Sequence, residues 1–139
     1  MNERDIGYFI KTINDKIKIK ADADLKTHNL TMSQSYVLTY LARRGGLATQ
    51  KEIEDFLQVS HPTVVGIVSR LEDKELVSSW MDERDRRNKN VRITEKARRL
   101  VNDMTRTIKL QESRMLAAFS PEEKKQLADM LRRIYQNLE

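Results

Sequence analysis

The chain has 139 residues, the length of one domain with a single modest core. It contains no cysteine, which excludes disulfides, thiolate zinc sites and thiol-based redox sensing. The net charge of +5, with 34% charged residues, permits binding to nucleic acid without establishing it. Because no apolar run approaches the roughly 20 residues of a membrane span, and the charged start lacks a signal-peptide core, we expect a cytoplasmic protein.

Helical periodicity predicts a first helix over residues 4–28, ending near His28 and Asn29. Bulky apolar residues recur on one of its faces: Ile6, Phe9, Ile10, Ile13, Ile17 and Ala21. A second helix is expected after Thr31, because Thr31 and Gln34 have the spacing of a capping box. The two glycines at 45–46 stop it.

Two further helix starts predict a helix-turn-helix. Thr49 and Glu52 form a second capping-box pattern, which opens a short helix. Ser60 suits the N-cap of the next helix, and Pro62 suits its first turn. Only two residues separate these helices, which is the short connection that the motif requires.

The second helix of this motif carries the candidate base contacts, because it lies in the major groove and its first turn meets base edges. The residues expected there are Ser60, His61, Thr63 and Val64. Hydroxyls can bind phosphates or bases, and a valine can contact a thymine methyl. Capping alone explains Ser60, so this set is weak evidence by itself. His61 would also make binding sensitive to pH at about 6–7.

After Lys74 the hydrophobic period changes from that of a helix to that of strands. Residues 76–81 and 89–93 predict two short strands, and the polar run 82–88 joins them into a β-hairpin. The basic side chains at its tip are Arg84, Arg86, Arg87 and Lys89. From residue 84 to residue 99 there are eight basic residues and two acidic ones. Basic charge concentrated directly after a helix-turn-helix favours contacts with phosphates and a narrow minor groove.

Two amphipathic helices complete the chain. Thr94 is the expected cap of a long helix to about Ala118, and Ser120 and Pro121 open the last one. Apolar stripes at 6–21, 97–115 and 127–138 exceed what outer helices around a small winged core can bury. Two-fold pairing would bury them, so we expect a homodimer.

The sequence offers no enzyme or metal site. His28 and His61 lie far apart, and neither is followed by an acidic residue three or four positions later. Neither a Gly-rich phosphate loop nor a nucleophile elbow is present, and the acidic pairs fit solvated helix faces. We therefore expect no catalytic residues, no metal and no cofactor.

The chain resembles the MarR family (multiple-antibiotic-resistance regulators) over essentially its whole length. The resemblance rests on Ser60-x-x-Thr63-Val64 with the following Ser69-Arg70-Leu71-Glu72, and on Asp85-x-Arg87 with the following Val91-Arg-Ile-Thr94. It implies one mainly α domain over 1–139 with a small β-hairpin wing. Within it the winged helix-turn-helix covers about 31–94 and the dimerisation helices about 4–28 and 95–138.

The resemblance also implies roles for single residues. Asp85 in the wing would brace Arg70 near the end of the recognition helix. Arg87 would enter the minor groove, with Arg86 as the other candidate. Two departures from the family pattern stand out. Glu75 occupies the place of a capping glycine, so either it takes a costly left-handed conformation or the turn differs. Ser79 stands where an arginine is usual in the family, so we expect fewer contacts with the DNA backbone at that edge.

These features predict a sequence-specific regulator of transcription that binds double-stranded DNA. We expect a ligand-responsive repressor, with activation left open, bound as a homodimer to a palindromic operator with half-sites about 34 Å apart. The alternative is a winged-helix module that binds protein instead of DNA, which a weak salt dependence would reveal.

The resemblance further implies a small effector, often phenolic, bound between the dimerisation and DNA-binding regions. Four residues near the first two helices could line such a pocket: Tyr8, Met32, Tyr36 and Tyr40. Residues of these types more often belong to a core.

Overall fold

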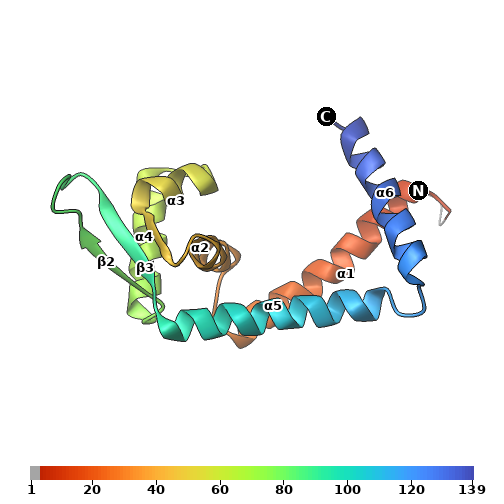
Figure 1. The fold of residues 1–139 in the computed structure, drawn as a ribbon, viewed down its shortest axis with the longest axis horizontal. Coiled ribbons are helices and arrows are strands. Elements are labelled where there is room, and N and C mark those ends of the chain that lie inside the picture. Colours follow the sequence, from red (N-terminus) through yellow and green to blue (C-terminus); the bar gives the residue numbers. More distant parts are fainter. Residues whose placement is uncertain (1–3) are drawn as a thin grey trace. The chain divides into compact units, whose positions relative to one another are not determined.

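A computed structural model describes residues 4–139, which form helices and one small antiparallel sheet (Figure 1). The elements are α1 Ile6–Thr27, α2 Met32–Arg43, β1 Leu47–Thr49, α3 Gln50–Leu57, α4 His61–Asp73, β2 Val77–Met81, β3 Lys89–Ile93, α5 Glu95–Met115 and α6 Pro121–Asn137. The chain divides into two units, one ending at Met104 and the other covering Thr105–Glu139. The predicted winged helix-turn-helix lies entirely in the first unit.

Local capping fixes where the helices begin, as the sequence predicts. The side chains of Thr31, Thr49 and Ser120 each accept a hydrogen bond from the backbone N–H three residues later. The side chain of that later residue in turn accepts a hydrogen bond from the backbone N–H of the cap residue. Each such box satisfies two backbone groups that a helix start would otherwise leave unpaired. Thr94 caps α5 in a simpler way, since its Oγ1 accepts from Ala97 N–H at 3.2 Å.

The end of α4 adopts the costly alternative expected at Glu75. Its φ is +61°, in the left-handed region that favours glycine. Leu76 N–H donates to the carbonyl of Leu71, and Glu75 N–H donates to that of Glu72, each at 2.9 Å. This pair of bonds is a Schellman motif, so the chain makes a glycine-type helix end with a glutamate.

The sheet has three strands, one more than the predicted hairpin. β3 lies in the middle, between β1 and β2, and pairs antiparallel with both. Ala48 and Ser79 both stand opposite the buried Val91. β1 therefore anchors the hairpin to the segment between α2 and α3.

The core of the first unit packs the apolar faces of α2, α3 and α4 against the sheet and the start of α5. Its most completely buried side chains are Val37, Leu38, Leu41, Ile53, Val64, Val68, Leu71 and Val91. The polar Gln34 is also buried, where its side chain serves the α2 capping box and accepts a hydrogen bond from Lys74. This core fixes α4 relative to the root of the hairpin.

The helices beyond this core leave much apolar surface uncovered. On α1 the exposed apolar residues include Ile6, Phe9, Ile10, Ile13 and Ile17, as on the predicted stripe. In the second unit, α6 contains no buried residue, although its apolar residues recur at helical spacing: Leu127, Met130, Leu131, Ile134 and Leu138.

The helix α5 ends at Met115 rather than near Ala118, where the sequence predicted its end, and Ala118 has a positive φ of 71°. None of the helices within residues 4–139 has the length and hydropathy needed to cross a bilayer.

Candidate nucleic-acid interface

The helix-turn-helix consists of α3, a three-residue turn and α4. Gln58 allows the sharp turn by taking a left-handed conformation with φ of 54°. Ser60 then caps α4, and its Oγ lies 2.8 Å from Thr63 Oγ1. His61 Nδ1 lies 3.1 Å from Glu54 Oε2, which connects the start of α4 to α3. The two helices of the motif are thus held together at their near ends.

Val64 cannot be the base contact that the sequence analysis selected. Its side chain is 0% exposed and belongs to the core stripe that Leu71 continues. The neighbouring Val65 is 42% exposed, and Ser69 lies exposed one turn later. Helical spacing in the sequence already indicates that Val64 is buried, because a residue four positions from Val68 lies on the same face of the helix.

The other recognition-helix candidates are accessible. Ser60, His61, Thr63 and Arg70 are all exposed. Arg70 and Thr63 line a surface groove with the start of α2, where Thr31 and Ser33 lie. This groove places hydroxyls and a guanidinium side by side, a combination suited to phosphate oxygens.

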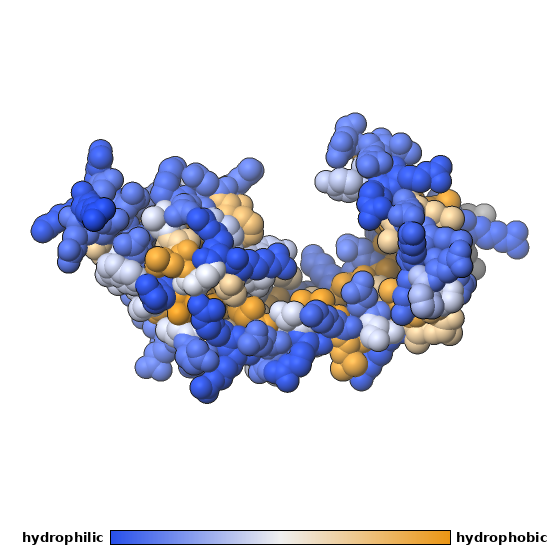
Figure 2. All heavy atoms as spheres, in the orientation of Figure 1, coloured by the Kyte–Doolittle hydropathy of each residue, from blue (hydrophilic) through white to orange (hydrophobic). Residues whose placement is uncertain are grey.

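The hairpin projects its tip beyond the helices of the first unit (Figure 1). Asp82 N–H donates to the Asn88 carbonyl, and Asn88 N–H donates to the Asp85 carbonyl, both at 2.9 Å. In Figure 2 this tip is covered by hydrophilic side chains. The tip is therefore a polar turn held by its own backbone, available for contact with an anionic partner.

Asp85 does not brace Arg70, which corrects the role implied by the resemblance. Its Oδ1 instead accepts from the backbone N–H of Arg87 at 3.1 Å and from Arg87 Nε at 3.2 Å. These two bonds, the backbone one foremost, lower the pKa of Asp85 below its ordinary value. The contact keeps Asp85 within the tip and orients Arg87, whose side chain remains 92% exposed.

The basic residues of the hairpin and of early α5 differ in what they contact. Within residues 4–139, Arg84 and Arg86 have no side-chain hydrogen bond or ion pair, and both are exposed. The remaining six are engaged: Arg87 with Asp85, Lys89 with Glu72, Arg92 over the Trp80 ring, Lys96 with the Lys74 carbonyl, Arg98 with the Gly45 carbonyl and Arg99 with Glu95. The positive charge of the wing thus concentrates at its tip.

Sequence reasoning missed a polar contact between the recognition helix and the wing. Glu72, in the last turn of α4, accepts a hydrogen bond from Ser79 and lies 3.8 Å from Lys89 Nζ. The sequence analysis expected only that Ser79 would make fewer contacts with the DNA backbone. The structure shows that its side chain instead contacts Glu72 within the protein. The pattern that places both partners near Glu72 is the strand register, which no sequence motif displays.

The histidines do not form a metal site with their neighbours. His28 Nε2 lies 3.6 Å from Asp24 Oδ1, an acid four positions before it that the forward spacing did not reveal. Elsewhere, His61 pairs with Glu54 alone. In the described part of the chain, no three His, Asp or Glu side chains converge as metal ligands.

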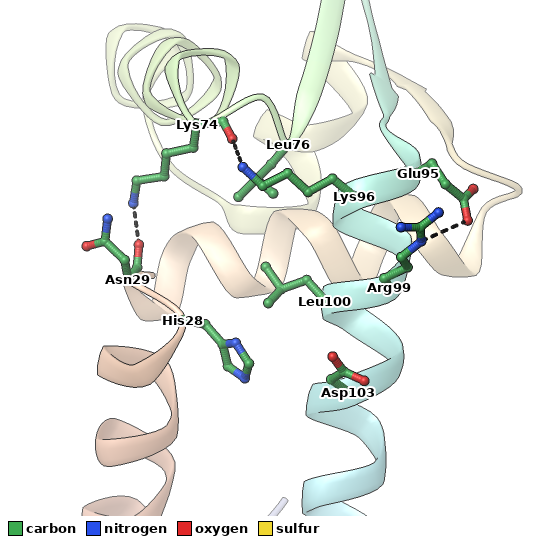
Figure 3. A pocket seen from close by; sticks show the side chains of 9 residues that line it. All are labelled: His28, Asn29, Lys74, Leu76, Glu95, Lys96, Arg99, Leu100 and Asp103. Carbon is green, nitrogen blue, oxygen red and sulfur yellow. Dashed lines mark hydrogen bonds and ion pairs between the residues drawn. The ribbon is translucent and has the colours of Figure 1, made fainter.

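A pocket of about 570 Å³ opens beside the C-terminal end of α4 (Figure 3). Leu76 and Leu100 form its apolar wall, and around them lie the cationic Lys74, Lys96 and Arg99 together with the acidic Glu95 and Asp103. Lys74 Nζ donates to the Asn29 carbonyl at 2.5 Å and to Gln34 Oε1 at 2.8 Å. Lys74, which follows the last residue of α4, thus connects the pocket to the end of the recognition helix.

The aromatic residues considered for an effector site do not line this pocket. Tyr40 stacks on Phe56 with ring centroids 4.3 Å apart, and it packs against the core together with Met32. Tyr36 is exposed, whereas Tyr8 makes an edge-to-face contact with Phe9 on α1. The reading of Tyr40 and Met32 as partial core residues is therefore confirmed.

The chain is similar to known regulators over nearly its whole length. The sequence model of the MarR family matches residues 28–88. The HTH-type transcriptional regulator YwoH of Bacillus subtilis (strain 168) is 32% identical over 135 residues, which covers 93% of this chain and 95% of that protein. These matches span the helix-turn-helix, and the second extends to the terminal helices.

Solved structures of S. aureus MepR share the fold. MepR, described as a transcription regulator of the Staphylococcus aureus multidrug efflux pump MepA, aligns with a TM-score of 0.83 and 29% identity, covering 97% of this chain and 99% of that one. A MepR–DNA complex aligns with a TM-score of 0.78 and 30% identity, covering 96% and 99%. With this geometry and these similarities, the chain belongs to the MarR family of transcriptional regulators.

Proposed function

We propose that this protein regulates transcription by binding double-stranded DNA at specific sequences, with α4 in the major groove and the wing tip on the minor groove. The observation that carries the proposal is the pairing of two exposed features on one unit. α4 presents His61, Thr63 and Val65, while the hairpin projects Arg84, Arg86 and Arg87. The similarity to a MepR structure solved with DNA supports DNA binding by this fold.

Sequence discrimination would come mainly from α4. Its exposed side chains combine hydroxyls, an imidazole and a valine, which suit base edges and a thymine methyl. Wing arginines in the minor groove and on phosphates contribute affinity with little base information. Of the two candidates for the minor groove, Arg87 is the better placed, because Asp85 already orients its guanidinium.

We further propose a homodimer. The exposed apolar faces of α1 and of α6 each need a partner, and within residues 4–139 α6 has no buried residue of its own. A second copy of the chain would cover such faces, as the family resemblance implies. Two recognition helices related by a two-fold axis require a palindromic site with half-sites about one helical turn apart.

The direct test is to select genomic DNA fragments with the purified protein and to footprint the enriched fragments. The proposal expects one recurring palindrome whose protected half-sites lie about 10–10.5 base pairs apart, centre to centre. Enrichment of no common sequence would overturn sequence-specific binding. We expect repression where the palindrome overlaps a promoter. Because the proposed target is genomic DNA, we expect the protein to be located in the cytoplasm.

A small effector is the remaining part of the proposal. The pocket beside Leu76 and Leu100 combines an apolar wall with three cationic side chains, Lys74, Lys96 and Arg99, against the two carboxylates of Glu95 and Asp103. The excess of positive charge suits an aromatic acid. Occupancy would disturb the Lys74 contacts at the end of α4. We expect 4-hydroxybenzoate to raise the melting temperature and to weaken DNA binding, with both effects reduced in Lys96→Ala but not in the surface control Lys51→Ala. Unchanged melting and binding would refute this site for such acids.

The protein-binding alternative predicts a different dependence on salt. An apolar protein interface changes little with ionic strength, whereas phosphate contacts release counterions and weaken steeply. The charged, hydrophilic tip in Figure 2 favours the second behaviour.

A further inference from the structure

Glu72 lies where the recognition helix meets the two strands of the hairpin. A single carboxylate oxygen, Oε1, accepts a hydrogen bond from Ser79 on β2 and lies 3.8 Å from Lys89 Nζ on β3. The side chains of Glu72 and Lys89 are 36% and 38% exposed. One helix residue thus contacts both strands of the hairpin, through Ser79 opposite Val91 and through Lys89 opposite Met81.

The position of this contact along the hairpin matters, because the tip beyond it has no core. Lys89 pairs with Met81 at the last rung of the ladder, and residues 82–88 follow without a buried side chain. The direction in which the tip projects is therefore determined by the last paired residues of β2 and β3. Among residues 4–139, Glu72 makes the only side-chain hydrogen bond or ion pair between α4 and the hairpin strands.

The charge of Glu72 has no other evident use at this place. A carboxylate on the side of the molecule that meets DNA repels phosphates, so it lowers affinity unless it does something else. Lys89 points its ammonium group to this carboxylate, and the pair is locally neutral. Asp85, the residue first expected to tie the wing to α4, is occupied by Arg87 within the tip.

We propose that Glu72 is the positioning residue that sets the wing relative to the recognition helix, with Lys89 as its partner and not a DNA contact. The inference rests on the proposed DNA-binding function, which it deepens. α4 and the tip must engage adjacent grooves together, so loosening their connection weakens binding although each contact residue remains present.

The test compares Glu72→Gln, Lys89→Gln and the double variant in DNA affinity and in salt dependence. Glu72→Gln is expected to weaken binding to the selected palindrome by ~2- to 5-fold, the scale of a partly exposed ion pair. Removal of a negative charge by itself would strengthen binding, so the sign is decisive. Lys89→Gln should weaken binding equally without changing the slope of log K against log salt, and the double variant should be no worse than either single one.

A matched control is Glu83→Gln, the same change on the same hairpin, since Glu83 is exposed and has no side-chain hydrogen bond or ion pair in the described residues. It should leave affinity unchanged or raise it. If Glu72→Gln behaves like Glu83→Gln, the positioning role is refuted. If Lys89→Gln lowers the salt slope by about one and its effect multiplies with that of Glu72→Gln, Lys89 contacts phosphate instead.

A second readout does not require DNA. Trp80 is the single tryptophan of the chain and lies on β2, so its fluorescence anisotropy reports motion of the hairpin. The proposal expects faster depolarisation in Glu72→Gln than in wild type or Glu83→Gln, at equal melting temperature. Unchanged Trp80 mobility overturns the inference even if the protein binds no DNA, whereas increased mobility with no DNA binding would overturn only the proposed function.

Discussion

The recognition helix and the wing tip both face DNA in the proposed complex, but they are held in place by opposite means. α4 is fixed by its buried side, on which Val64, Val68 and Leu71 have at most 1% of their surface exposed. The tip has no buried side chain and is fixed by its own backbone bonds and by Asp85. Base reading by α4 is therefore coupled to fold stability, whereas charge at the tip can vary with little effect on folding.

The largest difference between the two regions should follow from removing packing under α4. Leu71→Ala is expected to lower the free energy of unfolding by about 2–5 kcal/mol, because it leaves a cavity in a fully buried site. Urea denaturation measures the loss. Arg84→Ala, at the exposed tip, should change stability by less than about 0.5 kcal/mol. Comparable losses in both variants would contradict the division between the two regions.

The next effect concerns the tip alone. Arg87→Ala should weaken operator binding by about 1–3 kcal/mol, the size of one good groove contact, and leave urea denaturation unchanged. An electrophoretic shift assay at fixed salt measures it. Arg86→Ala should cost less, since Asp85 orients only Arg87. Arg133→Ala on α6 provides the control for loss of an exposed charge elsewhere, and an equal effect there would refute the groove contact.

A smaller effect separates the two valines at the start of α4. Val65→Ala should reduce affinity for the selected palindrome by ~1 kcal/mol, about the value of the apolar group removed, and leave a scrambled duplex unaffected. Val64→Ala should reduce stability instead, because its side chain is fully buried. Competition titrations and denaturation curves on both variants distinguish the roles, and the reverse assignment would invalidate the exposed face described for α4.

The smallest effect tests the end of α4. Glu75→Gly should stabilise the protein by about 0.5–1 kcal/mol, since glycine adopts a positive φ without steric cost. The Schellman hydrogen bonds use backbone groups only, so they should persist in the variant. Denaturation by urea reports the gain, and DNA affinity should stay constant. A loss of stability would mean that the glutamate side chain contributes to this turn.

Local signals made most of the fold predictable. Capping boxes such as Thr31 with Gln34 operate over three residues, so their geometry is written in the sequence itself. The hairpin followed from a change of period, and its strands lie where the pattern placed them. β1 was missed because its three residues are extended only through pairing with β3, far away in the chain.

The candidate site was less predictable, since its contacts depend on strand register and on helix faces. Asp85 and Arg87 are neighbours in sequence and bond each other, and this local contact replaced the longer-range one to Arg70 that the resemblance suggested. Val64 was assigned to the interface, although it lies four positions before Val68 and shares the buried face of that residue. Glu72 reaches Ser79 and Lys89 through the fold alone.

The most direct test of the central claim is the salt dependence of binding to the selected duplex, followed by anisotropy of a labelled oligonucleotide. We predict that log K falls linearly with log salt, by about 0.9 for each phosphate that the protein neutralises. We also predict that Arg87→Ala makes the slope shallower, while a scrambled duplex binds far more weakly at every salt concentration. A flat dependence, or equal affinity for both duplexes, would contradict a winged helix that reads DNA.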